Sequence, residues 1–114
     1  HTLGHAIEQT SGYGKLLHGE AVSLGMIAAT FLSTKITGLK EETLEKLESI
    51  LKQHQLPVRL EGLEVEPLMK AISRDKKAVA GQVKWVLLEE PGLVHQTREV
   101  SPELVLEAID YLSP

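Results

Sequence analysis

The sequence has 114 residues, which is long enough for one domain with a real core and too short for two. Its formal net charge is −4 and charges of both signs are interspersed, which argues against a nucleic-acid partner and a polybasic membrane surface. It has no cysteine, so disulfide bonds and thiol nucleophiles are excluded, and we expect a soluble cytoplasmic protein.

A cluster of three histidines, His1, His5 and His18, opens the chain. His1 and His5 are four residues apart, so on a helix their rings lie on one face about one turn apart. Glycines at positions 12 and 14 predict a loop after this helix, which would let His18 fold back toward them. Because the chain has no signal peptide and does not begin with methionine, we expect it to start inside a longer or processed protein.

These histidines suggest a metal site. Neutral imidazole suits zinc and several other transition metals, and a zinc site needs at least three protein ligands. Three histidines would be enough, whereas two would need a partner from elsewhere. Spacing alone favours His1 and His5 as the pair that bridges a metal. The alternative is that all three are ordinary core or surface histidines, since pairs at helical spacing also arise by chance.

A long buried helix is predicted to follow His18. Residues 19–32 are mostly apolar, and Glu20 lies in the first turn, where a carboxylate suits the positive end of the helix dipole. Thr37 and Gly38 predict the end of this helix. The apolar run is too short and too often interrupted to cross a membrane.

An amphipathic helix is predicted next, over residues 39–55, ending before Pro57. Glutamate and lysine residues occupy one face, which we interpret as solvent-exposed. The opposite, apolar face is formed by Leu44, Leu47, Ile50 and Leu51.

A shorter helix is predicted over residues 66–73, and the charged residues 74–77 stand at its end. Residues 83–88 and 93–100 carry β-favouring side chains on either side of Pro91 and Gly92, so they predict a two-stranded hairpin.

A terminal helix is predicted to begin at Ser101 and Pro102, which suit the N-cap and first-turn positions, and to run to Leu112. The sequence therefore predicts a mainly α-helical domain with a small β-hairpin. It has no glycine-rich phosphate loop, so any nucleotide cofactor must be held elsewhere.

The motifs together resemble the 3-dehydroquinate synthase family of the shikimate pathway. The resemblance rests on residues 1–8 (HTLGHAIE), 12–14 (GYG) and 17–22 (LHGEAV), and it continues through 56–58 (LPV) and 74–77 (RDKK) in the family's order. It covers essentially the whole chain but matches the C-terminal helical domain of that family.

The resemblance implies that residues 1–114 are the C-terminal half of a two-domain fold, and that an N-terminal NAD-binding α/β domain is absent from this chain. It also implies a missing upstream glutamate ligand and an asparagine just before His1. We expect the full protein to be an NAD- and zinc-dependent, phosphate-eliminating lyase. Its substrate would be 3-deoxy-arabino-heptulosonate 7-phosphate, and the isolated chain would be inactive.

For this chain's own residues, the resemblance implies that His1 and His18 bind zinc or cobalt, rather than the pair favoured by spacing. His5 would face the substrate and take part in its proton network, with a catalytic and substrate-binding role. Lys76 would bind the substrate carboxylate, and Arg74 is a further candidate substrate contact. Glu20 is not expected to be a ligand, since its place in a helix's first turn is sufficient explanation.

Two other classes of function remain open. A related sugar-phosphate cyclase or a metal-dependent alcohol or glycerol dehydrogenase has a similar histidine cluster, although the 74–77 motif and Lys76 favour the synthase. A non-catalytic helical module is the third interpretation. The expected partners are a phosphorylated sugar acid, the N-terminal domain of the same enzyme and a second copy in a homodimer, with no nucleic acid and no membrane.

Overall fold

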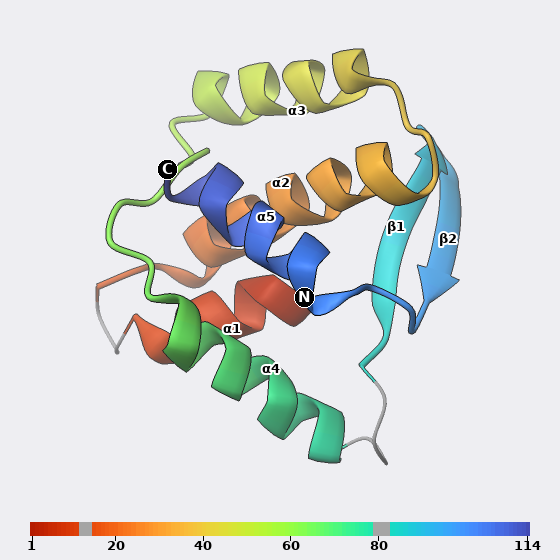
Figure 1. Cartoon of the computed structure of the whole chain (residues 1–114). Helices are drawn as coiled ribbons and strands as arrows, with labels where there is room; N and C mark the ends of the chain where they lie inside the picture. The colour runs from red at the N-terminus through yellow and green to blue at the C-terminus, as the bar shows by residue number, and fades with distance from the viewer. Residues whose placement is uncertain (12–14, 79–82) are drawn as a thin grey trace.

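The computed structural model describes residues 1–11, 15–78 and 83–114, without the side chains of residues 75–78. The predicted loop at residues 12–14 lies outside this part of the chain. Helices dominate, and a two-stranded antiparallel hairpin lies between α4 and α5 in the chain (Figure 1), so the predicted fold class is confirmed. In chain order the elements are α1 (Thr2–Thr10), α2 (His18–Ile36), α3 (Glu41–Gln53), α4 (Val65–Ala78), β1 (Trp85–Glu90), β2 (Leu93–Thr97) and α5 (Pro102–Leu112).

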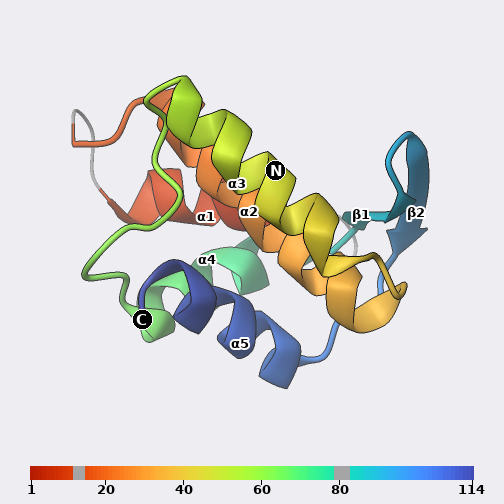
Figure 2. The ribbon, with the colours of Figure 1, turned by 90° about the horizontal axis from the view of Figure 1, so that it is seen from above.

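Helix α2 is the centre of the fold and contacts α1, α3, α5 and β1. In both views α3 runs alongside it (Figures 1 and 2). Its side chains Leu24, Ile27 and Leu32 are completely buried, as predicted for an apolar helix. It continues to Ile36 and ends at the predicted place, where Gly38 takes a φ of +77° that suits glycine.

Helices α1 and α2 approach each other closely through two glycines. A Cβ atom on Gly25 would lie 3.1 Å from the Cα atom of Gly4, and one on Gly4 would lie 3.1 Å from the carbonyl oxygen of Ala21. Neither position has room for a side chain, so the two backbones can touch. Leu3 and Ile7 of α1 are buried beside this contact and anchor the helix to the core.

Helix α3 corrects one sequence-based prediction. Leu44 and Leu51 are buried as expected, whereas Ile50 is 52% exposed. The stripe that packs on the core is centred between Leu47 and Leu51, and Ile50 lies about 80° around the helix from it, given 3.6 residues per turn. The helix is also shorter than predicted and ends at Gln53.

Helix α4 is longer than predicted, because it continues past Ser73 to Ala78, and the charged residues 74–77 form its last turn. Leu68 is completely buried and Ala71 nearly so, which fixes the helix against the core, where it contacts α1.

The hairpin forms around Gly92, which has a φ of +87°, with Trp85 paired to Thr97 and Leu88 to Val94. Both strands differ in extent from the prediction, with β1 ending at Glu90 and β2 at Thr97. The backbone N–H of Leu88 donates to the Ser33 hydroxyl at 2.9 Å, and the hydroxyl of Thr37 donates to the Leu88 carbonyl. The hairpin is thereby attached to the C-terminal end of α2.

The terminal helix α5 begins as predicted. The Ser101 side chain accepts a hydrogen bond from the Leu104 backbone N–H at 3.2 Å, and Pro102 occupies the first turn. Val105, Ile109 and Leu112 are buried. No described helix is both long and apolar enough to cross a membrane.

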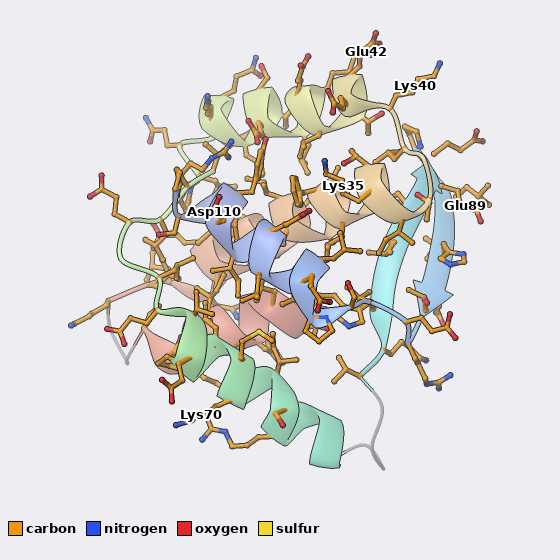
Figure 3. All side chains as sticks on the ribbon, viewed as in Figure 1. Lys35, Lys40, Glu42, Lys70, Glu89 and Asp110 are labelled. Atoms are coloured by element: carbon orange, nitrogen blue, oxygen red, sulfur yellow. The ribbon has the colours of Figure 1, made fainter. Side chains whose placement is uncertain are left out.

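An aromatic cluster formed by Phe31, Glu48, Arg59 and Tyr111 joins α2, α3, α5 and the connection before α4. The Tyr111 hydroxyl donates to Glu48 Oε1 at 2.5 Å, and Arg59 Nη1 donates to the same oxygen at 3.0 Å. The Tyr111 ring stacks on Phe31 with centroids 4.6 Å apart, and the Arg59 guanidinium lies 4.1 Å from its centroid. Other charged side chains, such as Lys40, Glu42 and Lys70, lie at the periphery of the molecule (Figure 3).

Candidate metal centre

A cavity of about 360 Å³ lies where α1, α2 and β1 meet. His1, His5 and Glu8 of α1 and His18 of α2 line it, so the structure gathers all three histidines of the predicted cluster at one site. The Gly4–Gly25 contact holds the two helices close together beneath this cavity. The volume is in the range of small-molecule sites.

His1 and His5 lie next to each other, as their spacing predicts. His1 is the N-cap residue of α1, and its carbonyl accepts the backbone N–H of His5 at 2.7 Å. Their rings meet edge to face, with centroids 5.3 Å apart and planes at 82°. Both residues are exposed, so their ring nitrogens are within reach of a bound ion or substrate.

His18 is paired with a residue that the sequence analysis did not single out. Its ring Nδ1 lies 2.8 Å from Glu8 Oε2, and the Glu8 carboxylate, an acceptor, requires Nδ1–H to donate. A spacing signal for Glu8 exists, because positions 1, 5 and 8 follow the i, i+4, i+7 pattern of one helix face. An exposed pair of this kind contributes at most about 1 kcal/mol to stability.

Glu20 caps α2, as expected. Its Oε1 accepts the backbone N–H of Leu17 at 2.9 Å, which satisfies a donor at the start of the helix. The bond fixes the backbone on both sides of His18, and Glu20 does not line the cavity.

The two basic candidates on α4 are not equally well described. The backbone of Lys76 lies in the last turn of α4, while its side chain lies outside the described residues. Arg74 is exposed and is not among the described residues that line the cavity. Their predicted roles in substrate binding stay predictions.

A cation that the sequence analysis missed also lines the cavity. Lys84, just before β1, is exposed and lines it, and the carbonyl of Lys84 accepts the Thr2 hydroxyl at 3.0 Å. This hydrogen bond joins the start of α1 to the start of β1. No sequence signal marks Lys84, because 82 residues separate it from its partner.

The remaining wall of the cavity is apolar. Val22, Met26 and Ala29 of α2 and Trp85 and Val86 of β1 supply it. The cavity therefore combines polar side chains, mostly from α1, with an apolar surface that disfavours water.

The donors present fit part of a transition-metal site. Imidazole nitrogens are ligands that zinc and cobalt accept, and all three histidines of the cluster line the cavity. Within the described residues, however, no three His, Asp or Glu side chains converge on one point that could hold a metal. A complete site on this surface would need at least one ligand in addition to the described residues, or a rearrangement of these side chains.

Known proteins are similar to this chain in sequence. The family described as 3-dehydroquinate synthase C-terminal matches residues 1–78. The 3-dehydroquinate synthase of Opitutus terrae is 43% identical over 94% of this chain and 30% of that protein. That of Methylacidiphilum infernorum is 39% identical over 90% of this chain and 29% of that protein. The chain thus spans about 30% of the length of these curated relatives.

A solved structure shares the fold. It is ValA, a 2-epi-5-epi-valiolone synthase from Streptomyces hygroscopicus subsp. jinggangensis, with NAD⁺ and Zn²⁺ bound. The TM-score is 0.83 over 96% of this chain and 31% of that chain, at 22% sequence identity. At this identity the likeness establishes a common architecture for the helices and the hairpin.

Proposed function

Because the chain belongs to the 3-dehydroquinate synthase family, whose C-terminal domain it matches, we propose that it is the metal- and substrate-binding part of such an enzyme. The full protein would add an N-terminal NAD-binding domain, in agreement with the 30% share of its relatives that this chain spans. The observation that carries the proposal is that His1, His5 and His18 all line one cavity in a chain with this family match.

The proposed reaction converts 3-deoxy-arabino-heptulosonate 7-phosphate to 3-dehydroquinate and phosphate, as a step of the shikimate pathway in the cytoplasm. The substrate carries a carboxylate, a phosphate and several hydroxyl groups, so its site needs cations and hydrogen-bonding side chains. The cavity offers both beside an apolar wall. That wall would exclude water from the reacting carbons.

His1 and His18 are the proposed metal ligands, completed by a glutamate of the N-terminal domain. A bound zinc or cobalt ion would polarise a substrate oxygen that gains negative charge. The support is the position of both imidazoles on the wall of one cavity and the preference of these metals for nitrogen ligands.

His5 is the proposed proton-handling residue. It is exposed on the same face of α1 as His1, so its ring can donate to or accept from a substrate hydroxyl or phosphate. Lys76 and Arg74 are proposed to bind the acidic groups of the substrate. Lys84 joins them in this proposal because it lines the same cavity as the histidines.

The test compares the full-length protein with the 114-residue chain in a phosphate-release assay that contains heptulosonate phosphate, NAD and zinc. We expect release by the full-length protein and none by the chain, because the NAD site and one metal ligand would come from the other domain. Turnover by the isolated chain would contradict this division. Gel filtration of the full-length protein would test the proposed homodimer.

A related sugar-phosphate cyclase is the second candidate, since the structure shares its fold with a valiolone synthase. Such an enzyme would act on a heptulose phosphate that lacks the carboxylate. Offering both substrates to the full-length protein separates the two, and net accumulation of NADH in either assay would indicate a dehydrogenase instead. A preference for the carboxylated substrate supports the synthase.

A further inference from the structure

We propose that Glu8 is a positioning residue that orients His18 for metal binding. The inference rests on the proposed function, in which His18 is a metal ligand. It adds a residue of α1 that makes no contact with the metal and acts through its hydrogen bond to His18.

The geometry of the pair assigns the two nitrogens of the ring different tasks. Because the Glu8 carboxylate can only accept, Nδ1 of His18 donates to Oε2 at 2.8 Å, and in the neutral ring that would bind a metal the lone pair is then on Nε2. Metal-binding histidines very often give their second N–H to a carboxylate in this way. The hydrogen bond fixes the tautomer and the ring orientation and makes Nε2 a more basic ligand.

Glu8 is held by a rigid element. Its neighbour Ile7 is completely buried, and Gly4, one turn earlier, touches Gly25 of α2. The carboxylate is therefore presented from a helix that has little freedom to shift, which is the requirement for orienting a ligand.

Two carboxylates thus hold His18 in different ways. Glu20 accepts the backbone N–H of Leu17 and fixes the chain at the start of α2. Glu8 contacts the ring itself. Because the His18 side chain is 65% exposed, packing does little to hold the ring, and among the described residues the bond to Glu8 is the contact that orients it.

A second His–Glu pair on the surface provides a matched comparison. His95 Nδ1 lies 3.4 Å from Glu89 Oε1 on the hairpin, and neither residue lines the cavity. The two pairs join the same kinds of group and differ in place and in separation, 2.8 Å for His18 and Glu8 against 3.4 Å for His95 and Glu89. A substitution at Glu89 therefore controls for the loss of a surface carboxylate.

The experiment uses the full-length protein and its Glu8→Ala, Glu8→Gln and Glu89→Ala variants. Zinc affinity is measured by competition with a chromophoric chelator, and the visible absorption of the cobalt-substituted protein reports the ligand geometry. We expect Glu8→Ala to weaken zinc binding 10- to 100-fold and to change the cobalt spectrum. Glu8→Gln should lie between it and the wild type, because its amide oxygen still accepts the hydrogen bond, and Glu89→Ala should match the wild type.

An unchanged or stronger zinc affinity in Glu8→Ala, with an unchanged cobalt spectrum, would overturn the inference. Equal losses in Glu8→Ala and Glu89→Ala would overturn it too, since they would show a general charge effect. Should Glu8→Ala not fold, Glu8→Leu decides, because its side chain fills a similar space and has no acceptor for His18, and a wild-type affinity and spectrum in that variant would overturn the inference. If the wild type itself binds no zinc, the proposed function fails, which is a separate result.

Discussion

Two clusters of this chain each contain a glutamate that pairs with a basic side chain, and they differ in how completely their polar groups are satisfied. In the aromatic cluster, Glu48 accepts from both Tyr111 and Arg59, and stacking covers the ring of Tyr111. In the cluster around the cavity, Glu8 contacts His18, while His1 and His5 meet each other only edge to face.

This difference indicates that the aromatic cluster stabilises the fold, whereas the cavity cluster is available to bind a ligand. The Glu48 side chain is 15% exposed, and its carboxylate is hydrogen-bonded within the chain. It therefore joins helices and is poorly accessible to a ligand. The histidines of the cavity are exposed and add little to stability, so their grouping is better explained by something they bind. Substitutions in the two clusters should therefore affect different properties.

The largest effect is expected from His18→Ala in the full-length protein. If His18 is a metal ligand as proposed, its loss removes several kcal/mol of charge stabilisation, so the proposed phosphate release should fall on the order of 10³-fold or more. Because His18 is exposed, the urea midpoint of the zinc-free protein should hardly move. A variant that is strongly destabilised yet active would show that the cavity cluster is structural.

Glu48→Ala should show the reverse behaviour. It leaves Arg59 and Tyr111 without their shared acceptor, which should lower the free energy of unfolding by about 2 kcal/mol in urea titrations. Zinc affinity should stay at the wild-type value. Glu45→Ala, an exposed position on the same helix, is the control and should cost a few tenths of a kcal/mol at most.

Gly25→Ala should lower both the stability and the zinc affinity, unlike the two substitutions above. The new Cβ would lie 3.1 Å from the Cα atom of Gly4, so α1 must shift, at a cost of about 1–3 kcal/mol in stability. Since α1 carries His1, His5 and Glu8, zinc affinity should fall as well. Gly19→Ala is the matched control on the same helix, because nothing lies within 4 Å of its Cβ.

The smallest effect is expected at alkaline pH. Burial, followed by the hydrogen bond to Glu48, raises the pKa of Tyr111 above its ordinary value of 10.0. The folded state thus holds this proton more tightly than the unfolded state, so the stabilisation is complete below pH 10 and is lost as the pH rises through the folded pKa. Unfolding titrations between pH 8 and 11 should show a fall in stability that is smaller in Tyr111→Phe.

Local sequence signals predicted most of the fold. The Ser101–Pro102 pair predicted where α5 begins, and Gly38 and Gly92 marked the end of α2 and the hairpin turn. The length of α4 and the exposure of Ile50 were not predicted, because both depend on how the helix packs against other parts of the chain and not on local sequence.

The site was predictable where it lies on one helix and not where it joins distant segments. The proximity of His1 and His5 follows from helical spacing. The pairing of Glu8 with His18 depends on how α1 and α2 pack, and the approach of Lys84 depends on a hydrogen bond across 82 residues. The roles of His1, His18 and Lys76 came from the resemblance and stay predictions.

The glycine contact between α1 and α2 has a consequence for how freely this sequence can vary. On the outer face of α1, Gln9 is exposed, and nearly any residue compatible with a helix should be tolerated there. On the inner face, one added methyl group at Gly4 would meet the Ala21 carbonyl and move three cavity side chains together. Two positions of α1 that lie five residues apart therefore tolerate substitution very differently, and a library of variants at Gly4 and Gln9 would show the contrast directly.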